Sequence, residues 1–228
     1  KIAGMPAAAG MPAVAVTDTN NMFCALEFSE TAAREGVQPI IGCQIDLAYI
    51  ATEAGKRPEA PAPVVLLAQN EAGYMNLMKL NSAAYIDKGG ELPQVRLDDL
   101  ERYATGLICL TGGPDGPIGR LLRDGQYPAA DALMTRLKAI YGDRLYVELQ
   151  RHPEDGGLPE AEKMSEQGHV EMAYAMDIPL VATNDVYFPK AQIYEAHDAL
   201  LCIADGAYVD QQEPRRRLTP QHYFKSQQ

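Results

Sequence analysis

Residues 13–45 read AVAVTDTNNMFCALEFSETAAREGVQPIIGCQI, and this stretch contains the repeating unit of the fold. It opens with a short apolar run at 13–17, which is typical of a strand. A segment with helical spacing follows over 23–35 and meets Gly36, a residue that commonly ends helices. A second apolar run follows at 39–45. Strand, helix and strand in this order predict a βαβ unit.

The same alternation continues to about residue 204 and predicts an α/β fold. Leu133, Leu137 and Ile140 form the stripe of a helix that packs against a sheet. Two stretches rich in Ala, Pro, Gly or charge, 51–63 and 88–94, are predicted surface loops. The further strands are predicted at 64–68, 106–111, 145–150 and 179–183, and the further helices at 71–84, 128–141, 159–176 and 193–204.

Composition excludes several classes of protein. The chain has 228 residues, of which 46% are apolar and 22% charged, so it is neither disordered nor fibrous. Its net charge of −11 disfavours non-specific binding of nucleic acid by this chain alone. The apolar opening is broken at Pro6 and Pro12 and does not predict a secretory leader.

The four cysteines, Cys24, Cys43, Cys109 and Cys202, are far apart in the sequence. This spacing excludes a zinc ribbon and a disulfide scaffold. We therefore expect a cytoplasmic protein with no membrane partner. Cys109 lies in an apolar strand and is expected to be a small buried residue.

Polar side chains follow the predicted strands where each strand ends. Asp18 follows the first strand, Gln44 lies near the end of the second, His152 follows the strand at 145–150, and Asp185 follows the last. In a parallel α/β sheet these ends lie at one edge, where metal-binding groups collect. Carboxylate and imidazole ligands suit a divalent cation. The alternative is that each Asp only caps a helix or closes a turn.

For the other motifs a structural role is favoured over a chemical one. The sequence TGGPDG at 111–116 lacks the lysine of a phosphate-binding loop and is expected to be a tight turn. Arg215–Arg217 favours a solvated linker over a contact with nucleic acid or a neighbouring domain. The remaining histidines lie in helical or linker stretches and are weak ligand candidates: His169, His197 and His222.

Six segments resemble, in order, the PHP (polymerase and histidinol phosphatase) domain at the N-terminus of bacterial DNA polymerase III alpha subunits. They are residues 15–45, VVLLAQNEAGYMNLMKLNS at 64–82, LYVELQRH at 145–152, PLVATNDVYF at 179–188, EAHDALLCIADG at 195–206 and RLTPQHYFKS at 217–226.

The resemblance implies a distorted (βα)7 TIM-like PHP barrel whose first strand, with its His-x-His pair, is missing here. It implies a PHP domain over 1–210 and a linker over 211–228 toward the polymerase palm. The full chain would be a nucleotidyltransferase, a DNA-directed DNA polymerase of DNA replication in the bacterial cytoplasm. This chain would meet DNA only through the complete holoenzyme.

Metal ligands carry over residue by residue. Asp18, His152 and Asp185 match ligands of the family pattern, whereas three further ligand positions hold Thr19 in place of His, Gln44 in place of Glu, and Tyr187 in place of His. A threonine hydroxyl binds cations weakly, glutamine lacks the bridging charge, and tyrosine, with a reference pKa of about 10, keeps its proton near neutral pH. We expect no metal, or one weakly bound Mg, Mn or Zn ion.

The resemblance therefore implies a non-catalytic scaffold. Its partners would be the remainder of the alpha chain and the proofreading exonuclease (epsilon) subunit. The alternative is a metal-dependent phosphoesterase or 3′–5′ exonuclease with a reduced ligand set, in which His197 or Glu148 fills a gap. An unrelated α/β domain is the third possibility.

Overall fold

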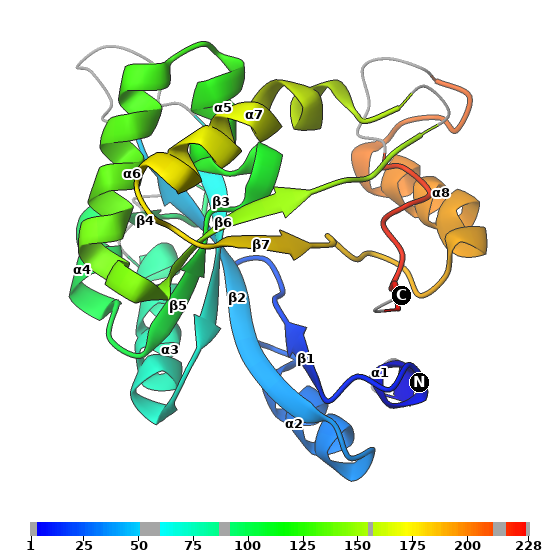
Figure 1. The fold of residues 1–228 in the computed structure, drawn as a ribbon. Coiled ribbons are helices and arrows are strands. Elements are labelled where there is room, and N and C mark those ends of the chain that lie inside the picture. The colour runs from blue at the N-terminus through cyan, green and yellow to red at the C-terminus, as the bar shows by residue number, and fades with distance from the viewer. Residues whose placement is uncertain (1–3, 51–59, 87–91, 155–156, 212–217, 227–228) are drawn as a thin grey trace.

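Seven strands form one curled sheet in the computed structural model, which describes residues 4–50, 60–86, 92–154, 157–211 and 218–226 (Figure 1). The strand order is β1-β2-β3-β5-β6-β7, with β4 paired to β2 beside this path. The strands are β1 (Ala13–Val16), β2 (Gln38–Ala48), β3 (Ala62–Ala68), β4 (Val95–Arg96), β5 (Leu107–Leu110), β6 (Leu145–Gln150) and β7 (Leu180–Thr183).

The sheet is mixed, because β3 runs antiparallel to both of its neighbours, β2 and β5. The pairs β1–β2, β5–β6 and β6–β7 are parallel. The βα alternation predicted parallel pairing, but no helix occurs in the described residues between β2 and β3, and antiparallel neighbours need no crossover helix. The predicted loop at 51–63 is also too long: Ala62 and Pro63 belong to β3, and residues 51–59 lie outside the description.

Five of the helices were predicted to within about two residues of their bounds: α2 (Ala25–Arg34), α3 (Glu71–Ile86), α6 (Tyr127–Tyr141), α7 (Glu160–Ala175) and α8 (Tyr194–Asp205). Three short helices were not predicted: α1 (Gly4–Ala8), α4 (Leu97–Tyr103) and α5 (Pro117–Arg123). Elements this short carry too few turns for a hydrophobic period to show. Among the described residues, no helix is both long and apolar enough to span a bilayer.

The core lies where α3 and α6 cover the central strands. α3 packs on β3 and β5, and α6 packs on β5 and β6. Cys109 is fully buried there, as predicted, and all four cysteines are free thiols. In Figure 1, α3, α4 and α6 lie on one side of the sheet, and α8 lies at the opposite side with the C-terminal segment. Fully buried aliphatic residues include Ile45, Leu66, Leu107, Leu137 and Leu145.

Strand direction decides which side chains share an edge. Since β3 is antiparallel to β2 and β5 is antiparallel to β3, β5 runs in the same direction as β2. β1, β6 and β7 follow that direction through their parallel pairs. The carboxyl ends of β1, β2, β5, β6 and β7 therefore lie at one edge of the sheet, which we call the rim. Asp18, His152 and Asp185 follow strands that end at this rim, as the sequence analysis predicted.

Candidate functional site: the rim of the sheet

The loop after β1 is fixed against β2. Thr19 pairs with Gln44 in a parallel bridge, and the Gln44 N–H donates to the Asp18 carbonyl over 3.1 Å. Asn20 follows with a φ of 53°, and its side-chain amide exchanges hydrogen bonds of 2.9 and 3.0 Å with Asp46. Asparagine tolerates this left-handed conformation better than most residues. Asp18, Thr19 and Gln44 consequently form one group at the β1–β2 part of the rim.

His152 lies at the end of β6 and is buried, with 1% of its surface exposed. Its backbone N–H donates to the Glu162 carboxylate of α7 over 2.9 Å, and its ring Nδ1 lies 2.7 Å from Glu162 Oε1. The other ring nitrogen, Nε2, has no hydrogen-bond partner among the described residues. In many metal sites a carboxylate hydrogen-bonded to the far ring nitrogen orients the ligating histidine. Glu162 holds the His152 ring in this way.

The face of the His152 ring is covered by a second imidazole. His222 stacks on it with ring centroids 3.8 Å apart and ring planes at 6°. Burial lowers the pKa of His222 to about 4, with the nearby His152 acting in the same direction. His222 is therefore neutral near pH 7, and its Nδ1–H can donate to the Asp185 carbonyl, 2.8 Å away.

His222 belongs to residues 218–226, a segment that packs along the chain after β7. The Asn184 amide donates to the Tyr223 carbonyl over 2.8 Å. The Tyr187 N–H donates to the His222 carbonyl, and the Phe224 N–H donates to the Phe188 carbonyl, each over 3.0 Å. These bonds hold the segment over the β6–β7 part of the rim.

Asp185 lies beside this segment. Burial raises the pKa of the Asp185 carboxyl above its ordinary value, although a hydrogen bond with Tyr187 and the nearby His152 act against that shift. The Tyr187 ring lies 5.6 Å from the His197 ring and 5.9 Å from the His222 ring. Tyr187 therefore belongs to an aromatic cluster with His197 and His222.

Glu148 on β6 is a buried carboxylate that sequence reasoning treated only as a substitute ligand; 3% of it is exposed. It accepts hydrogen bonds from the Gly112 N–H over 2.9 Å, from the Gln150 amide and from the Thr183 hydroxyl. The sequence signal that could have identified Glu148 as a buried hydrogen-bond acceptor is an acidic residue in a largely apolar strand. Glu148 thus joins the ends of β5, β6 and β7.

The glycine-rich stretch at 111–116 forms part of the same hydrogen-bond network. It forms a short 3-10 turn at Gly113–Asp115, as its sequence predicted. Gly112 has a φ of 82°, and a Cβ there would lie 2.0 Å from the Pro63 carbonyl oxygen, so only glycine fits. Its N–H faces the protein's own Glu148 carboxylate, which occupies the donor that a bound phosphate would need.

The rim residues form two separate groups. Among the described residues, no set of three or more His, Cys, Asp or Glu side chains is arranged to hold a metal ion. β3 and β5 lie between β2 and β6 in the strand order, so the two groups come from strands that do not pair with each other. Within the described ranges, the donors present therefore do not fit a multinuclear metal cluster.

Sequence comparison identifies the family of the chain. The family model described as "PHP domain" matches residues 3–152, about two thirds of the chain. The chain belongs to the PHP domain family. This PHP domain is 48% identical over 227 residues to the DNA polymerase III subunit alpha of Caulobacter vibrioides, an alignment that covers 99% of the chain and 19% of the relative.

Further relatives of this PHP domain carry the same name. The DNA polymerase III subunit alpha of Rickettsia bellii is 36% identical over 228 residues, and that of Pseudomonas aeruginosa is 36% identical over 224 residues. The chain covers 18% of each of these relatives, so it spans less than a fifth of their length.

Among solved structures, a proposed metal-dependent phosphoesterase from Bifidobacterium adolescentis is similar with a TM-score of 0.48 and 13% identity. The match covers 81% of this chain and 80% of that one.

One sequence prediction about this PHP domain can be compared with the structure, and another cannot. His152 and Asp185 lie together, joined through His222, which the sequence gave no reason to place there. Arg215–Arg217, the linker candidate, lies outside the described residues.

Proposed function

We propose that this PHP domain is part of the alpha subunit of a bacterial replicative DNA polymerase and acts there as a non-catalytic scaffold. The observation that carries the proposal is the 48% identity to one such subunit over nearly the whole chain. The scaffold role is supported by the substitutions at Thr19, Gln44 and Tyr187, which remove a bridging carboxylate and two imidazoles from the family's ligand pattern.

The geometry of the rim supports the same role. A multinuclear hydrolytic site holds its ions about 3.5–4 Å apart and uses them to activate water. Gln44 carries no charge that could bridge two ions, and one face of the His152 ring is covered by His222. We propose that the rim binds no metal, or one weakly held divalent cation contacted by Asp18, His152 or Asp185.

The proposed partners follow from the proposed parent chain. They are the remainder of the alpha subunit and the proofreading exonuclease (epsilon) subunit in the bacterial cytoplasm, and DNA is met only through the holoenzyme. The acidic balance of the chain, −11, favours protein partners over direct contact with phosphate. The domain boundary proposed at 210 belongs to this same assignment.

Metal analysis combined with a nuclease assay tests the scaffold role. The purified chain is loaded with Mn or Zn, desalted, analysed for bound metal, and incubated with single- and double-stranded DNA. We expect at most one ion per chain and no cleavage above buffer. Two or more tightly bound ions with robust cleavage would contradict the proposal.

The exonuclease partner needs a separate test. A complete alpha subunit and a version that lacks this domain are each titrated with purified exonuclease subunit, and complex formation is followed by sedimentation velocity. We expect the complex to require the domain. Equal binding by both versions would remove the exonuclease from the list of partners while leaving the metal experiment unaffected.

A single-ion hydrolase is the second candidate, and one observation favours it. His152 presents a buried Nε2 without a partner in the described chain, and Glu162 orients its ring. If this function is correct, Asp185→Asn abolishes hydrolysis while Asp131→Asn, on the exposed surface of α6, leaves it unchanged. An unchanged rate in Asp185→Asn excludes this function.

A further inference from the structure

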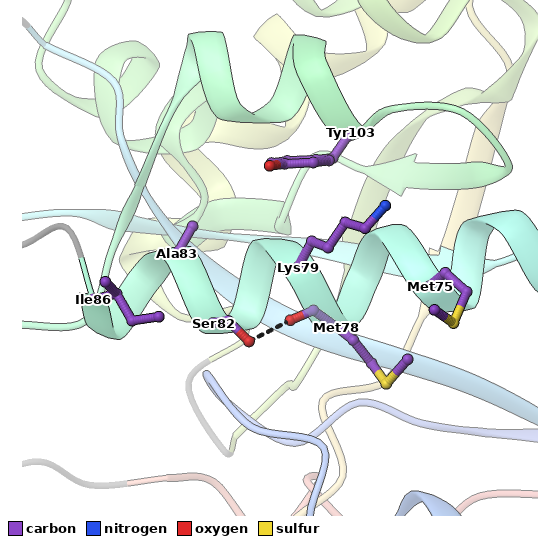
Figure 2. A pocket seen from close by; sticks show the side chains of 7 residues that line it. All are labelled: Met75, Met78, Lys79, Ser82, Ala83, Ile86 and Tyr103. Carbon is purple, nitrogen blue, oxygen red and sulfur yellow. Dashed lines mark hydrogen bonds between the residues drawn. The ribbon is translucent and has the colours of Figure 1, made fainter.

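Apolar side chains are exposed on the outer faces of both α3 and α8. On α3, Met75 and Ile86 line a groove of about 340 Å³ that faces Tyr103 of α4 (Figure 2). Lys79 belongs to the same lining, so a charged group interrupts this face. The face on α8 lies beside the C-terminal segment, whereas α3 lies at the opposite side of the sheet (Figure 1).

The outer face of α8 is apolar without interruption. Ile193, directly before the helix, is followed by Ala196, Leu200 and Ile203 at intervals of three, four and three residues, the spacing of a helix that packs against another element. We call these four residues the α8 stripe. Leu200 is 63% exposed and Ile203 is 78% exposed, whereas Leu201 lies on the buried side of the helix. In the described structure α8 is therefore apolar on two faces and covered on one.

Phe188 connects α8 with the end of the described chain. The centre of its ring lies 5.4 Å from that of His197 and 6.3 Å from that of Tyr194, and both of these residues belong to α8. The Phe188 carbonyl accepts the Phe224 N–H over 3.0 Å. The described part of the chain ends at Ser226, two positions after Phe224. A continuation of the chain would therefore start beside α8.

The α8 stripe is small for a partner that diffuses freely. α8 has 12 residues, so it is about 18 Å long. One face of a helix about 10 Å wide then covers roughly 200 Å², whereas a standard interface buries about 800 Å² on each partner. A linked occupant needs less area, because a short tether raises its effective concentration to about the millimolar range. The size of the stripe thus favours an occupant on the same chain.

We propose that the α8 stripe is covered by the part of the parent chain that follows Gln228. The inference rests on the proposed function, which makes this domain part of an alpha subunit. The alignment covers 19% of the Caulobacter vibrioides relative, so about four fifths of that subunit lies outside it. The covering surface is apolar, because a polar surface would lose its water against Leu200 and Ile203 without gaining a hydrogen bond.

Thiol labelling compares the 228-residue chain with the complete alpha subunit. Ile203→Cys places the reporter on the α8 stripe, and Tyr174→Cys on α7 is the matched control, because each of these residues is 78% exposed. After reaction with a maleimide, tandem mass spectrometry separates the new thiol from the exposed Cys24 and the buried Cys202. We expect labelling of Ile203→Cys to be about tenfold or more slower in the alpha subunit, and labelling of Tyr174→Cys to be the same in both chains.

Ile203→Asp is the decisive variant, and Tyr174→Asp is its control. Each is combined in the alpha subunit with Leu200→Cys as the reporter. We expect Ile203→Asp to raise labelling of this reporter to the rate of the 228-residue chain, because an aspartate is costly to bury against an apolar surface. Tyr174→Asp should leave the rate low.

Four results would overturn the proposal. They are equal labelling of Ile203→Cys in both chains, equal effects of the two aspartates, equal protection of Tyr174→Cys, and self-association of the 228-residue chain that Ile203→Asp abolishes. The last would show that the stripe binds a second copy. None of these results changes the metal or exonuclease experiments, and cleavage of DNA by the purified chain would contradict the scaffold role alone.

Discussion

The imidazoles of His152 and His222 are stacked face to face, although 69 positions of sequence lie between the two residues. His152 is held from behind by Glu162, so its ring is a fixed surface for the arriving His222. The pair therefore fastens the segment at 218–226 to the end of β6. It also removes one face of His152 from contact with solvent or a ligand.

Replacing His222 with alanine should loosen this segment. The change removes the stacked ring and the bond to the Asp185 carbonyl, which together contribute about 1–2 kcal/mol. We expect faster amide hydrogen exchange at Tyr187 and Phe224, whose N–H groups bond across this contact. Gln221→Ala, next to it in the chain, is the control. Unchanged exchange in His222→Ala would show that the stack does not hold the segment.

The Glu148→Ala variant should be strongly destabilised. Its carboxylate satisfies Gly112, Gln150 and Thr183, and removing it leaves buried donors without an acceptor. Breaking a buried charged network of this kind costs about 3–5 kcal/mol. Urea denaturation followed by circular dichroism measures the loss, and Glu195→Ala, at an exposed position of α8, should change stability by less than about 0.5 kcal/mol. Similar midpoints for the two variants would contradict this reading.

His169 makes stability depend on pH. It is buried in α7, and burial lowers its pKa in the folded chain to about 4, below the ordinary value of 6.5. Folding therefore favours neutral His169. Its contribution is complete above pH 6.5 and is lost as the pH falls toward 4, by roughly 3 kcal/mol in all.

The test compares the free energy of unfolding at pH 7 and pH 5 for the natural chain and His169→Gln. The variant should lose less stability between these two values. His222, whose pKa is also lowered to about 4, leaves a residual pH dependence in both proteins. An identical loss in both would assign the whole dependence to other groups.

Gly73→Ala should be destabilising although it lies in a helix. A Cβ at this position would lie 1.8 Å from the Gly106 carbonyl oxygen, so α3 and the turn before β5 would have to separate. Overpacking of this kind costs about 1–3 kcal/mol or more. Gly4→Ala is the control, since its Cβ would meet only Glu35 at 3.8 Å. Equal melting temperatures would show that the turn accommodates the methyl group.

Much of the fold could be predicted because strands and long helices have different hydrophobic periods. β6 and α6 match their predicted ranges almost residue for residue. The direction of β3 could not be predicted, because a two-residue period is the same in either direction. α4 and α5 were missed because seven residues complete barely two turns.

The rim was predictable in part. The position of Asp18, His152 and Asp185 at the ends of strands followed from the sequence, since parallel strands end at one edge. The cover over His152 did not, because His222 reaches it from a segment with no strand or helix period. The bonds of Glu148 were also hidden, because its donors come from three different strand ends.

Because β3 is antiparallel to its neighbours, the two edges of the sheet differ in structure. Its carboxyl end opens away from the rim, where Asn70 accepts the Gly73 N–H over 3.0 Å and the Gln69 N–H donates to the Gly106 carbonyl over 2.9 Å. At that far edge the backbone of α3 at Gly73 is in direct contact with the turn at Gly106, where a Cβ would not fit. Sequence change there should be limited by backbone fit, whereas at the rim it should be limited by the buried hydrogen bonds that Glu148 accepts.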